Sequence, residues 1–191
     1  MINYNISMST KIDYRIKKVL ISELQIKKAC KKAAIWVNKT YANLKKPLII
    51  VAILRGAVLF FGELLKNISI DVETDFIAFS SYNGKTSQQF KPKLIADIRF
   101  NIKDRDVLIV EDVIDTGSTI FEAIQLFKKR KPKSIKVISL IKKKLNILTF
   151  KPNYSCFTVG KEFIVGFGLD YQQIFRNLPY IGILKDKYIK N

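Results

Sequence analysis

Histidine is missing from this 191-residue sequence, and cysteine occurs only twice. The absence of histidine removes the commonest general base and metal ligand, and with it every Ser-His or Cys-His mechanism. Acid–base chemistry therefore falls to carboxylates, lysine or tyrosine, and any metal would be a hard ion held by oxygen. The two cysteines, Cys30 and Cys156, lack metal-ligand spacing, and we interpret both as buried free thiols of a reducing compartment.

Long apolar runs are missing as well. No stretch is long enough to span a bilayer, and the N-terminal segment has no apolar core of the kind found in signal peptides. We therefore expect a cytoplasmic protein with no membrane partner. An apolar fraction of 48% and a charged fraction of 26% are typical of a globular chain. Because no repeat or linker divides the sequence, we predict a single domain over residues 1–191.

Acidic residues are outnumbered by basic ones, 16 to 34, which gives a net charge of +18. A nucleic-acid interface would gather these cations into a patch. Here lysine is scattered through predicted helices, loops and both termini, so we interpret the charge as a generally basic, solvated surface with no specific nucleic-acid partner. Such a surface still favours anionic ligands, phosphates included.

Strand and helix patterns alternate along the chain. Ser22 begins a helix signal with Gln25 at the capping-box position, and an apolar stripe follows at Ile26, Cys30, Ala33, Val37, Tyr41 and Leu44. A second helix-like run reaches Lys66, and a third is predicted at 118–130. Apolar runs predict strands at 48–54, 72–79, 106–110 and 134–141, with shorter ones at 155–160, 163–168 and 180–184. This alternation indicates an α/β fold whose mainly parallel central sheet is flanked by helices.

The stretch "VLIVEDVIDTGSTI", residues 107–120, carries the strongest chemical signal. An apolar strand leads into two acids, a third follows, and a Thr-Gly-Ser-Thr turn then stands where a helix begins. Free backbone N–H groups and the helix dipole make such a turn suitable for a phosphate monoester. The acids suit sugar hydroxyls and Mg²⁺. The turn is neither a Walker A loop nor a dinucleotide fingerprint, since neither pattern is complete.

This stretch closely resembles the phosphoribosyl pyrophosphate (PRPP) motif of the type I phosphoribosyltransferases. Further segments, "ILRGAVLFFGELL", "DFIAFSSYNGKTS", "SLIKK", "EFIVGFGLDY" and "FRNLPYIG", resemble successive blocks of the bacterial hypoxanthine phosphoribosyltransferases. They occur in the right order and cover roughly residues 20–184. The resemblance implies that terminal segments add a small hood to the fold. It also implies an enzyme that joins ribose 5-phosphate from PRPP to N9 of a 6-oxopurine and releases pyrophosphate with the help of Mg²⁺.

The resemblance also implies roles for residues on the PRPP side of the site. The 5-phosphate is expected at Thr116, Gly117, Ser118 and Thr119. The ribose hydroxyls and the metal are expected at Glu111 and Asp112, with Asp170 as a further metal carboxylate. Pyrophosphate is expected at Arg55, Gly56 and Arg176, beside a peptide bond that is cis in some members of the family. Ser81 and Tyr82 would begin a mobile loop that closes over the reacting centre.

On the purine side, Asp115 matches the general base at purine N7. Lys143 matches the lysine that donates to O6, although Lys142 and Lys144 stand beside it and leave the register open. Phe163 would stack on the base, and Ile164 would meet the base edge through its backbone. Two segments depart from the family pattern. The turn before Phe163 reads Val159, Gly160, Lys161, and the mobile loop carries Lys85, Gln88 and Gln89.

Two alternatives remain open on the sequence alone. The enzyme could prefer guanine or xanthine, since hypoxanthine and guanine share the O6 that Lys143 would read. The PRPP fold could instead serve an RNA-binding regulator, an interpretation that the high charge favours and that the purine-side set opposes. We expect a homodimer or a homotetramer from the resemblance, because spacing does not reveal the oligomeric state.

Overall fold

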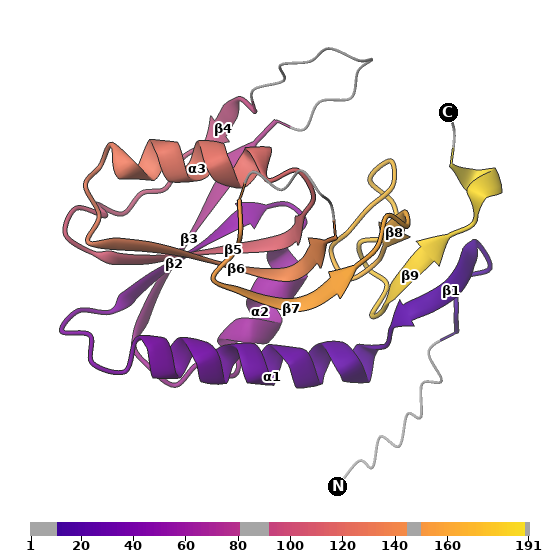
Figure 1. Cartoon of the computed structure of the whole chain (residues 1–191), viewed down its shortest axis with the longest axis horizontal. Coiled ribbons are helices and arrows are strands. Elements are labelled where there is room, and N and C mark those ends of the chain that lie inside the picture. Colours follow the sequence, from indigo (N-terminus) through magenta and orange to yellow (C-terminus); the bar gives the residue numbers. More distant parts are fainter. Residues whose placement is uncertain (1–10, 81–91, 145–149, 190–191) are drawn as a thin grey trace, which may run out of the picture.

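A six-stranded sheet forms the centre of the computed structural model, which describes residues 11–80, 92–144 and 150–189 (Figure 1). Its strand order is β4-β3-β2-β5-β6-β7, and every neighbouring pair is parallel except β3 and β4. The strands are β2 Leu48–Leu54, β3 Val72–Phe79, β4 Leu94–Ala96, β5 Asp106–Ile114, β6 Ser134–Lys143 and β7 Tyr154–Val159. The predicted mainly parallel sheet is therefore confirmed, and its carboxyl ends meet along one edge.

Helices cover both faces of this sheet. Helix α1 (Glu23–Thr40) and helix α2 (Val58–Leu65) lie on one face, and helix α3 (Ser118–Lys128) lies on the other (Figure 1). Alternate residues of β2 explain its unbroken apolar sequence: Ile50 packs into the α1 and α2 core, and Ile49 packs into the α3 core. A strand with a core on each face has no solvent side on which to place polar residues.

Helix α1 begins where the sequence predicts. The Ser22 hydroxyl accepts a hydrogen bond from the Gln25 backbone N–H, and the Gln25 side chain accepts one from the Ser22 N–H at 2.8 Å. The helix ends at Thr40, before the end of the apolar stripe, and the buried Tyr41 forms its C-cap. Cys30 is buried as predicted, whereas Cys156 is only half-buried, because it lies on the edge strand β7.

Several element boundaries differ from the sequence predictions. Strand β5 continues through Ile114, so the first two acids of the turn lie within the strand and are held by its pairing with β6. Strand β6 likewise continues to Lys143. The run predicted at 163–168 contains only the two-residue strand β8, Ile164–Val165, because the glycines beyond it adopt positive φ. The sequence did not predict β1 or β4.

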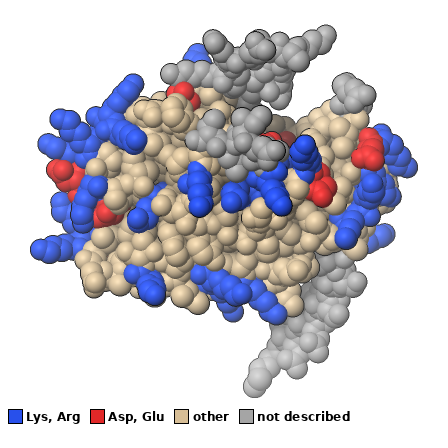
Figure 2. All heavy atoms as spheres, in the orientation of Figure 1, with Lys and Arg blue, Asp and Glu red and all other residues tan. Residues whose placement is uncertain are grey.

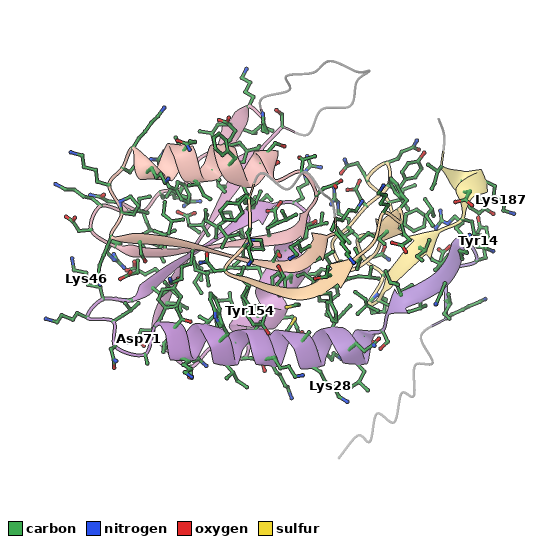
Figure 3. All side chains as sticks on the ribbon, viewed as in Figure 1. Tyr14, Lys28, Lys46, Asp71, Tyr154 and Lys187 are labelled. Atoms are coloured by element: carbon green, nitrogen blue, oxygen red, sulfur yellow. The ribbon has the colours of Figure 1, made fainter. Side chains whose placement is uncertain are left out.

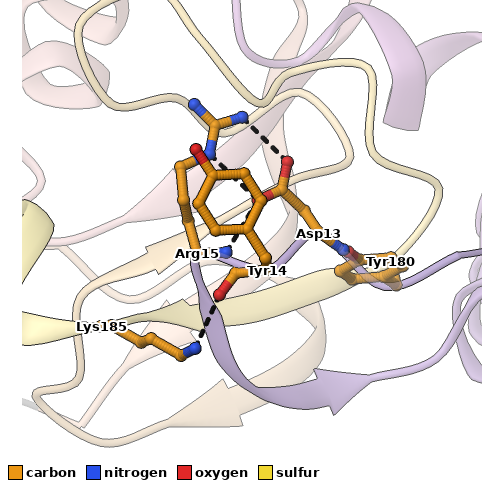
Figure 4. A network of polar contacts seen from close by, with 5 residues as sticks. All are labelled: Asp13, Tyr14, Arg15, Tyr180 and Lys185. Atoms are coloured by element: carbon orange, nitrogen blue, oxygen red, sulfur yellow. Dashed lines mark hydrogen bonds and ion pairs between the residues drawn. The ribbon is translucent and has the colours of Figure 1, made fainter.

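A three-stranded antiparallel hood is built from the two ends of the described chain. Its order is β1-β9-β8, with β1 at Ile16–Ile21 and β9 at Ile181–Leu184, followed by the short 3-10 helix η1, Asp186–Tyr188. Polar contacts join the ends (Figure 4). Asp13 accepts from Arg15 at 2.8 Å, its N–H donates to Tyr180 Oη at 2.9 Å, and Lys185 donates to the Tyr14 carbonyl at 2.6 Å. The hood expected from the resemblance is therefore present.

Lysine and arginine side chains are spread over most of the face shown in Figure 2, as expected for a solvated basic surface. Lys28 on α1 points away from the molecule, whereas Tyr154 of β7 points toward α1 and packs against the Trp36 ring, with 5.3 Å between ring centroids (Figure 3). Within the described residues, no helix is both long and apolar enough to cross a membrane.

Candidate active site

Polar residues from separate segments meet at the carboxyl edge of the parallel sheet, where open α/β sheets bind ligands. A crevice of about 120 Å³ is lined by residues of β2, β3, β5 and α3, namely Ile53, Leu54, Gly56, Phe79, Ser80, Glu111, Asp112 and Thr119. A smaller hollow of about 80 Å³ adjoins it, lined by Glu111 and residues 113–120. The fold thus brings the predicted pyrophosphate turn beside the predicted ribose and phosphate segment.

The turn before α3 has the geometry of an anion site. Gly117 is the N-cap residue and has φ 85°, a left-handed conformation that glycine adopts without steric cost. The glycine N-cap offers no side-chain cap, and the Ser118 N–H donates to Thr116 Oγ1 over a long 3.4 Å, so weakly engaged backbone donors line the small hollow. The hydroxyls of Thr116 and Ser118 lie 3.2 Å apart beside them. Together with the helix dipole, these donors suit a phosphate group.

Two adjacent carboxyl groups lie behind this turn. Glu111 is 8% exposed, and its Oε2 is buried without a hydrogen-bond partner among the described residues. Burial, followed by the neighbouring charge of Asp112, raises the pKa of Glu111 well above its usual value. Burial also raises the pKa of Asp112 to about 6. A buried carboxyl oxygen without a partner is unusual, and a ligand that brings hydroxyl donors would satisfy it.

Asp115 and Lys143 face each other across the mouth of the site. Lys143 Nζ lies 3.7 Å from Asp115 Oδ2, and the lysine side chain is 17% exposed while the aspartate is 53% exposed. Neighbouring residues of a strand point to opposite faces, so Lys142 cannot occupy this position while Lys143 does. Among the three candidate lysines, the structure therefore brings Lys143 to the acidic turn.

The pyrophosphate turn makes a close backbone contact with the hood. Gly56 leaves no space for a side chain, because a Cβ there would lie 1.7 Å from Asp112 Oδ2. A Cβ on Gly168, which has φ +98°, would lie 2.0 Å from the Gly56 carbonyl oxygen. The Leu54–Arg55 peptide bond is cis, as in some members of the family that the sequence resembles. Two glycines thus allow three distant segments to meet.

Arg176 anchors the same contact from the hood. Its guanidinium donates to the Gly168 carbonyl at 2.7 Å and pairs with Asp170 Oδ1 at 2.7 Å. Gln173 Oε1 accepts from Arg176 Nη2 at 3.2 Å and from Arg55 Nη1 at 3.4 Å. The sequence alone does not single out Gln173 or Gly168, because only the folded chain shows that they reach the turn after β2.

The purine-side aromatic residue is accessible. Phe163 is 39% exposed and packs edge-on against Tyr171, with 5.4 Å between the ring centroids. Ile164 is buried beside it and pairs with Ile183 in the hood sheet. Ser81 and Tyr82, the predicted start of the mobile loop, lie outside the described residues.

The carboxylates do not form a closed metal cage. Within residues 11–80, 92–144 and 150–189, no group of three or more acidic or cysteine side chains could hold a metal ion. Asp170 is paired with Arg176, and Glu111 and Asp112 belong to a different strand. Mg²⁺ usually keeps water ligands and binds through one or two carboxylates together with substrate phosphates. The buried, partnerless oxygen of Glu111 beside Asp112 fits such a shared site.

Comparison with known proteins identifies relatives along most of the chain. The phosphoribosyl transferase domain family matches residues 17–172. The hypoxanthine-guanine phosphoribosyltransferase of Lactococcus lactis is 45% identical, over 91% of this chain and 94% of its own. That of Mycoplasma genitalium is 42% identical, over 89% and 97%.

Solved structures give the same answer. A hypoxanthine phosphoribosyltransferase from Staphylococcus aureus superposes with a TM-score of 0.86 and 36% identity, covering 93% of this chain and 96% of its own. The Trypanosoma cruzi enzyme in complex with the product IMP gives a TM-score of 0.84 at 27% identity, covering 94% and 100%.

Proposed function

This chain belongs to the phosphoribosyl transferase family, and we propose that it converts hypoxanthine and PRPP to IMP and pyrophosphate, with guanine as a second substrate. The observation that carries the proposal is the Lys143–Asp115 pair at the mouth of the phosphate turn. One side chain of the pair donates and the other accepts, so the two suit a 6-oxopurine, which offers O6 as acceptor and N7–H as donor. The turn of α3 would hold the ribose phosphate next to it.

In the reaction, the bond between the ribose anomeric carbon and pyrophosphate breaks, and the bonding electrons leave with pyrophosphate. A bond then forms from purine N9 to that carbon, and the N7 proton moves to Asp115. Lys143 donates to the exocyclic O6 and stabilises the negative charge that shifts onto it as N7 loses its proton. Arg55 and Arg176 stabilise the charge that develops on the leaving pyrophosphate. The chain has no histidine, and Asp115 is an exposed carboxylate that pairs with Lys143, so it suits the role of base.

Mg²⁺ would be held through one or two of the carboxylates Glu111, Asp112 and Asp170 together with oxygens of PRPP, and would neutralise charge on the pyrophosphate. The raised pKa values of Glu111 and Asp112 fit this role, because an arriving cation and the ribose hydroxyls favour their ionised forms. Phe163 would stack on the purine, and the backbone of Ile164 would meet its edge. Ser81 and Tyr82 would begin the loop that excludes water from the cationic transition state.

The base preference is a further part of the proposal. Lys143 reads an oxygen that hypoxanthine and guanine share, and relatives named for both bases support activity on both. Gly160 and Lys161 directly precede the segment expected to contact the purine, Phe163 and Ile164. These two residues would decide whether the enzyme also accepts xanthine. We further expect a cytoplasmic homodimer or homotetramer, although the proposal does not depend on either property.

The direct test is to supply the purified protein with PRPP and Mg²⁺ and to offer hypoxanthine, guanine or xanthine in turn. We expect IMP and GMP, with pyrophosphate released in equal amount, and no product when Mg²⁺ is removed by a chelator. If no base yields a nucleotide at saturating PRPP, the proposed transferase activity is disproved. The RNA-binding regulator would then be the favoured function. A product from xanthine alone would instead correct the base preference.

A further inference from the structure

A tight turn in the hood has an unexpected sequence. Tyr171 and Ile174 exchange backbone hydrogen bonds of 3.1 and 3.0 Å, and the two residues between them, Gln172 and Gln173, have φ of 51° and 65°. Two-residue turns with both central residues left-handed strongly prefer Asn-Gly, because glycine adopts this conformation without strain. Retaining glutamine at the second position is therefore sterically unfavourable, and such outliers often mark function.

The Gln173 side chain suggests what that function is. Its Oε1 accepts from Arg55 Nη1 at 3.4 Å and from Arg176 Nη2 at 3.2 Å. The backbone of the turn is also held by Asp170, because the Gln173 N–H donates to Asp170 Oδ2 at 2.8 Å. Gln172 is exposed, as Gln173 is, but its side chain makes no hydrogen bond within the described part of the chain. Only the second glutamine of the pair therefore has a reason to be there.

The two arginines come from distant segments of the chain and carry like charges. Arg176 is already held by Asp170 and by the Gly168 carbonyl, so the bridge chiefly orders Arg55, whose exposed guanidinium would otherwise spread over many rotamers. The neutral Gln173 holds the two like charges together without adding a further negative charge. Asp170 already offsets part of the charge on Arg176, and a second carboxylate in place of Gln173 would further weaken the attraction for the phosphate anion that the arginines are expected to bind.

We propose that Gln173 is a positioning residue that aligns Arg55 and Arg176 into one binding unit for pyrophosphate before substrate arrives. This rests on the proposed function, which assigns both arginines to the pyrophosphate group. Gln173 acts through the arginines and touches no reacting atom. The energetic reason is that ordering two long side chains in advance removes an entropic cost from PRPP binding. The strained turn is retained because glycine would relieve the strain and lose the bridge.

The test compares Gln173→Gly with Gln172→Gly, since both replace a left-handed glutamine of the same turn. We expect both variants to keep or raise the melting temperature, because glycine suits the turn. Only Gln173→Gly should weaken pyrophosphate binding measured by calorimetry, and raise the KM for PRPP about three- to tenfold, with the KM for hypoxanthine unchanged. A merely structural role would move the melting temperature and leave this KM pattern alone.

A third variant tests the need for a neutral side chain. Gln173→Glu keeps the acceptor and its length but adds a negative charge, so it should weaken pyrophosphate binding more than Gln173→Gly does. Equal pyrophosphate affinity in wild type, Gln173→Gly and Gln173→Glu would overturn the proposal. If the wild-type protein formed no nucleotide but lost pyrophosphate binding on Gln173→Gly, the proposed function would fail while the bridge would stand.

Discussion

The two halves of the candidate site are built in opposite ways. The ribose and phosphate half comes from one continuous segment, in which β5, the acidic turn and the first residues of α3 follow each other within residues 107–120. The pyrophosphate half is assembled from a turn after β2 and a hood loop that lies 118 positions further along the chain. Local backbone geometry shapes the first half, whereas only tertiary packing shapes the second.

The halves also differ in charge and burial. The continuous half places Glu111 and Asp112 at the inner end of the crevice, where burial raises the pKa of both carboxyls. The assembled half presents guanidinium groups near the surface and holds them with Asp170, Gln173 and a backbone carbonyl. PRPP would bridge the two halves, with its ribose diol on the acids and its pyrophosphate on the arginines. Substitutions that affect one half or the other test this division.

The largest effect is expected from Asp115→Asn in the continuous half. The amide keeps the size of the side chain but cannot take a proton, so kcat should fall roughly a hundred- to ten-thousand-fold. The KM for PRPP should change little, because the phosphate turn stays intact. Steady-state kinetics with hypoxanthine provide the measurement, and Asp186→Asn, at an exposed position in η1, serves as the control. A kcat within a few-fold of wild type would show that Asp115 is not the general base and has only a structural role in the turn.

The next largest effect is expected from Gly168→Ala in the assembled half. A methyl group there would lie 2.0 Å from the Gly56 carbonyl oxygen at a φ of +98°, so the hood loop and the β2 turn must separate. Displacement of this kind should raise the KM for PRPP about tenfold or more. Gly62→Ala in α2 is the matched control, because a Cβ there meets nothing within 4 Å. An unchanged KM would mean that the two segments need not touch.

The same contrast explains what the sequence could predict. The strand, the acids and the phosphate turn were predicted because they lie within one short segment whose order of residue types follows from strand and helix geometry. The predicted capping box at Ser22 was right for the same reason. The exact lysine of the 142–144 run needed the structure, since a register shift of one residue reverses the side chain.

Gln173 and Gly168 could not have been found in this way. Nothing within residues 166–176 alone indicates that this segment packs on the turn after β2, and the two-residue strand β8 is too short to give a pattern. The role of Gly168 is a close approach of its backbone to the Gly56 carbonyl, which only the folded chain reveals. Contacts between distant segments depend on the topology of the whole sheet and hood.

A smaller effect is expected from Glu111→Gln in the continuous half, on the melting temperature of the protein without substrate. The folded-state pKa of Glu111 lies above its unfolded value, so the folded protein holds this proton more tightly. Its contribution to stability is complete below the unfolded pKa and is lost as the pH rises through the folded pKa. Glu111→Gln should therefore melt at least about 2 °C higher than wild type at high pH.

The comparison is made by melting both proteins at about pH 5 and about pH 8, with Asp71→Asn, at an exposed position, as the control. The advantage of Glu111→Gln should shrink toward the lower pH, where the wild-type carboxyl is also neutral. A constant difference across the range would show that Glu111 is not buried as an ionised group at the higher pH. The control should follow wild type throughout.

The smallest effect is expected for nucleic acid, which would contact the molecule outside both halves of the site. Four lysines, Lys128, Lys131, Lys133 and Lys151, line a cavity of about 450 Å³ at the end of α3, and Lys133 among them is paired with Asp106. No carboxylate lines this cavity, whereas the catalytic crevice carries acids that repel a polyanion. Nucleic acid should therefore bind there by phosphate attraction alone, without sequence preference.

Titration of labelled RNA and DNA at low and near-physiological salt measures this. We expect weak binding at low salt that collapses as salt is raised, because the gain comes from the release of counterions. The double variant Lys128→Glu, Lys131→Glu should lower the low-salt affinity further than Lys28→Glu, Lys32→Glu on α1, which changes the net charge equally. Phe150 lines this cavity but is partly buried against the α3 core, and lysines that contact phosphates give no means of selecting a sequence. Tight, sequence-selective binding at physiological salt would contradict this and would favour the RNA-binding regulator over the enzyme.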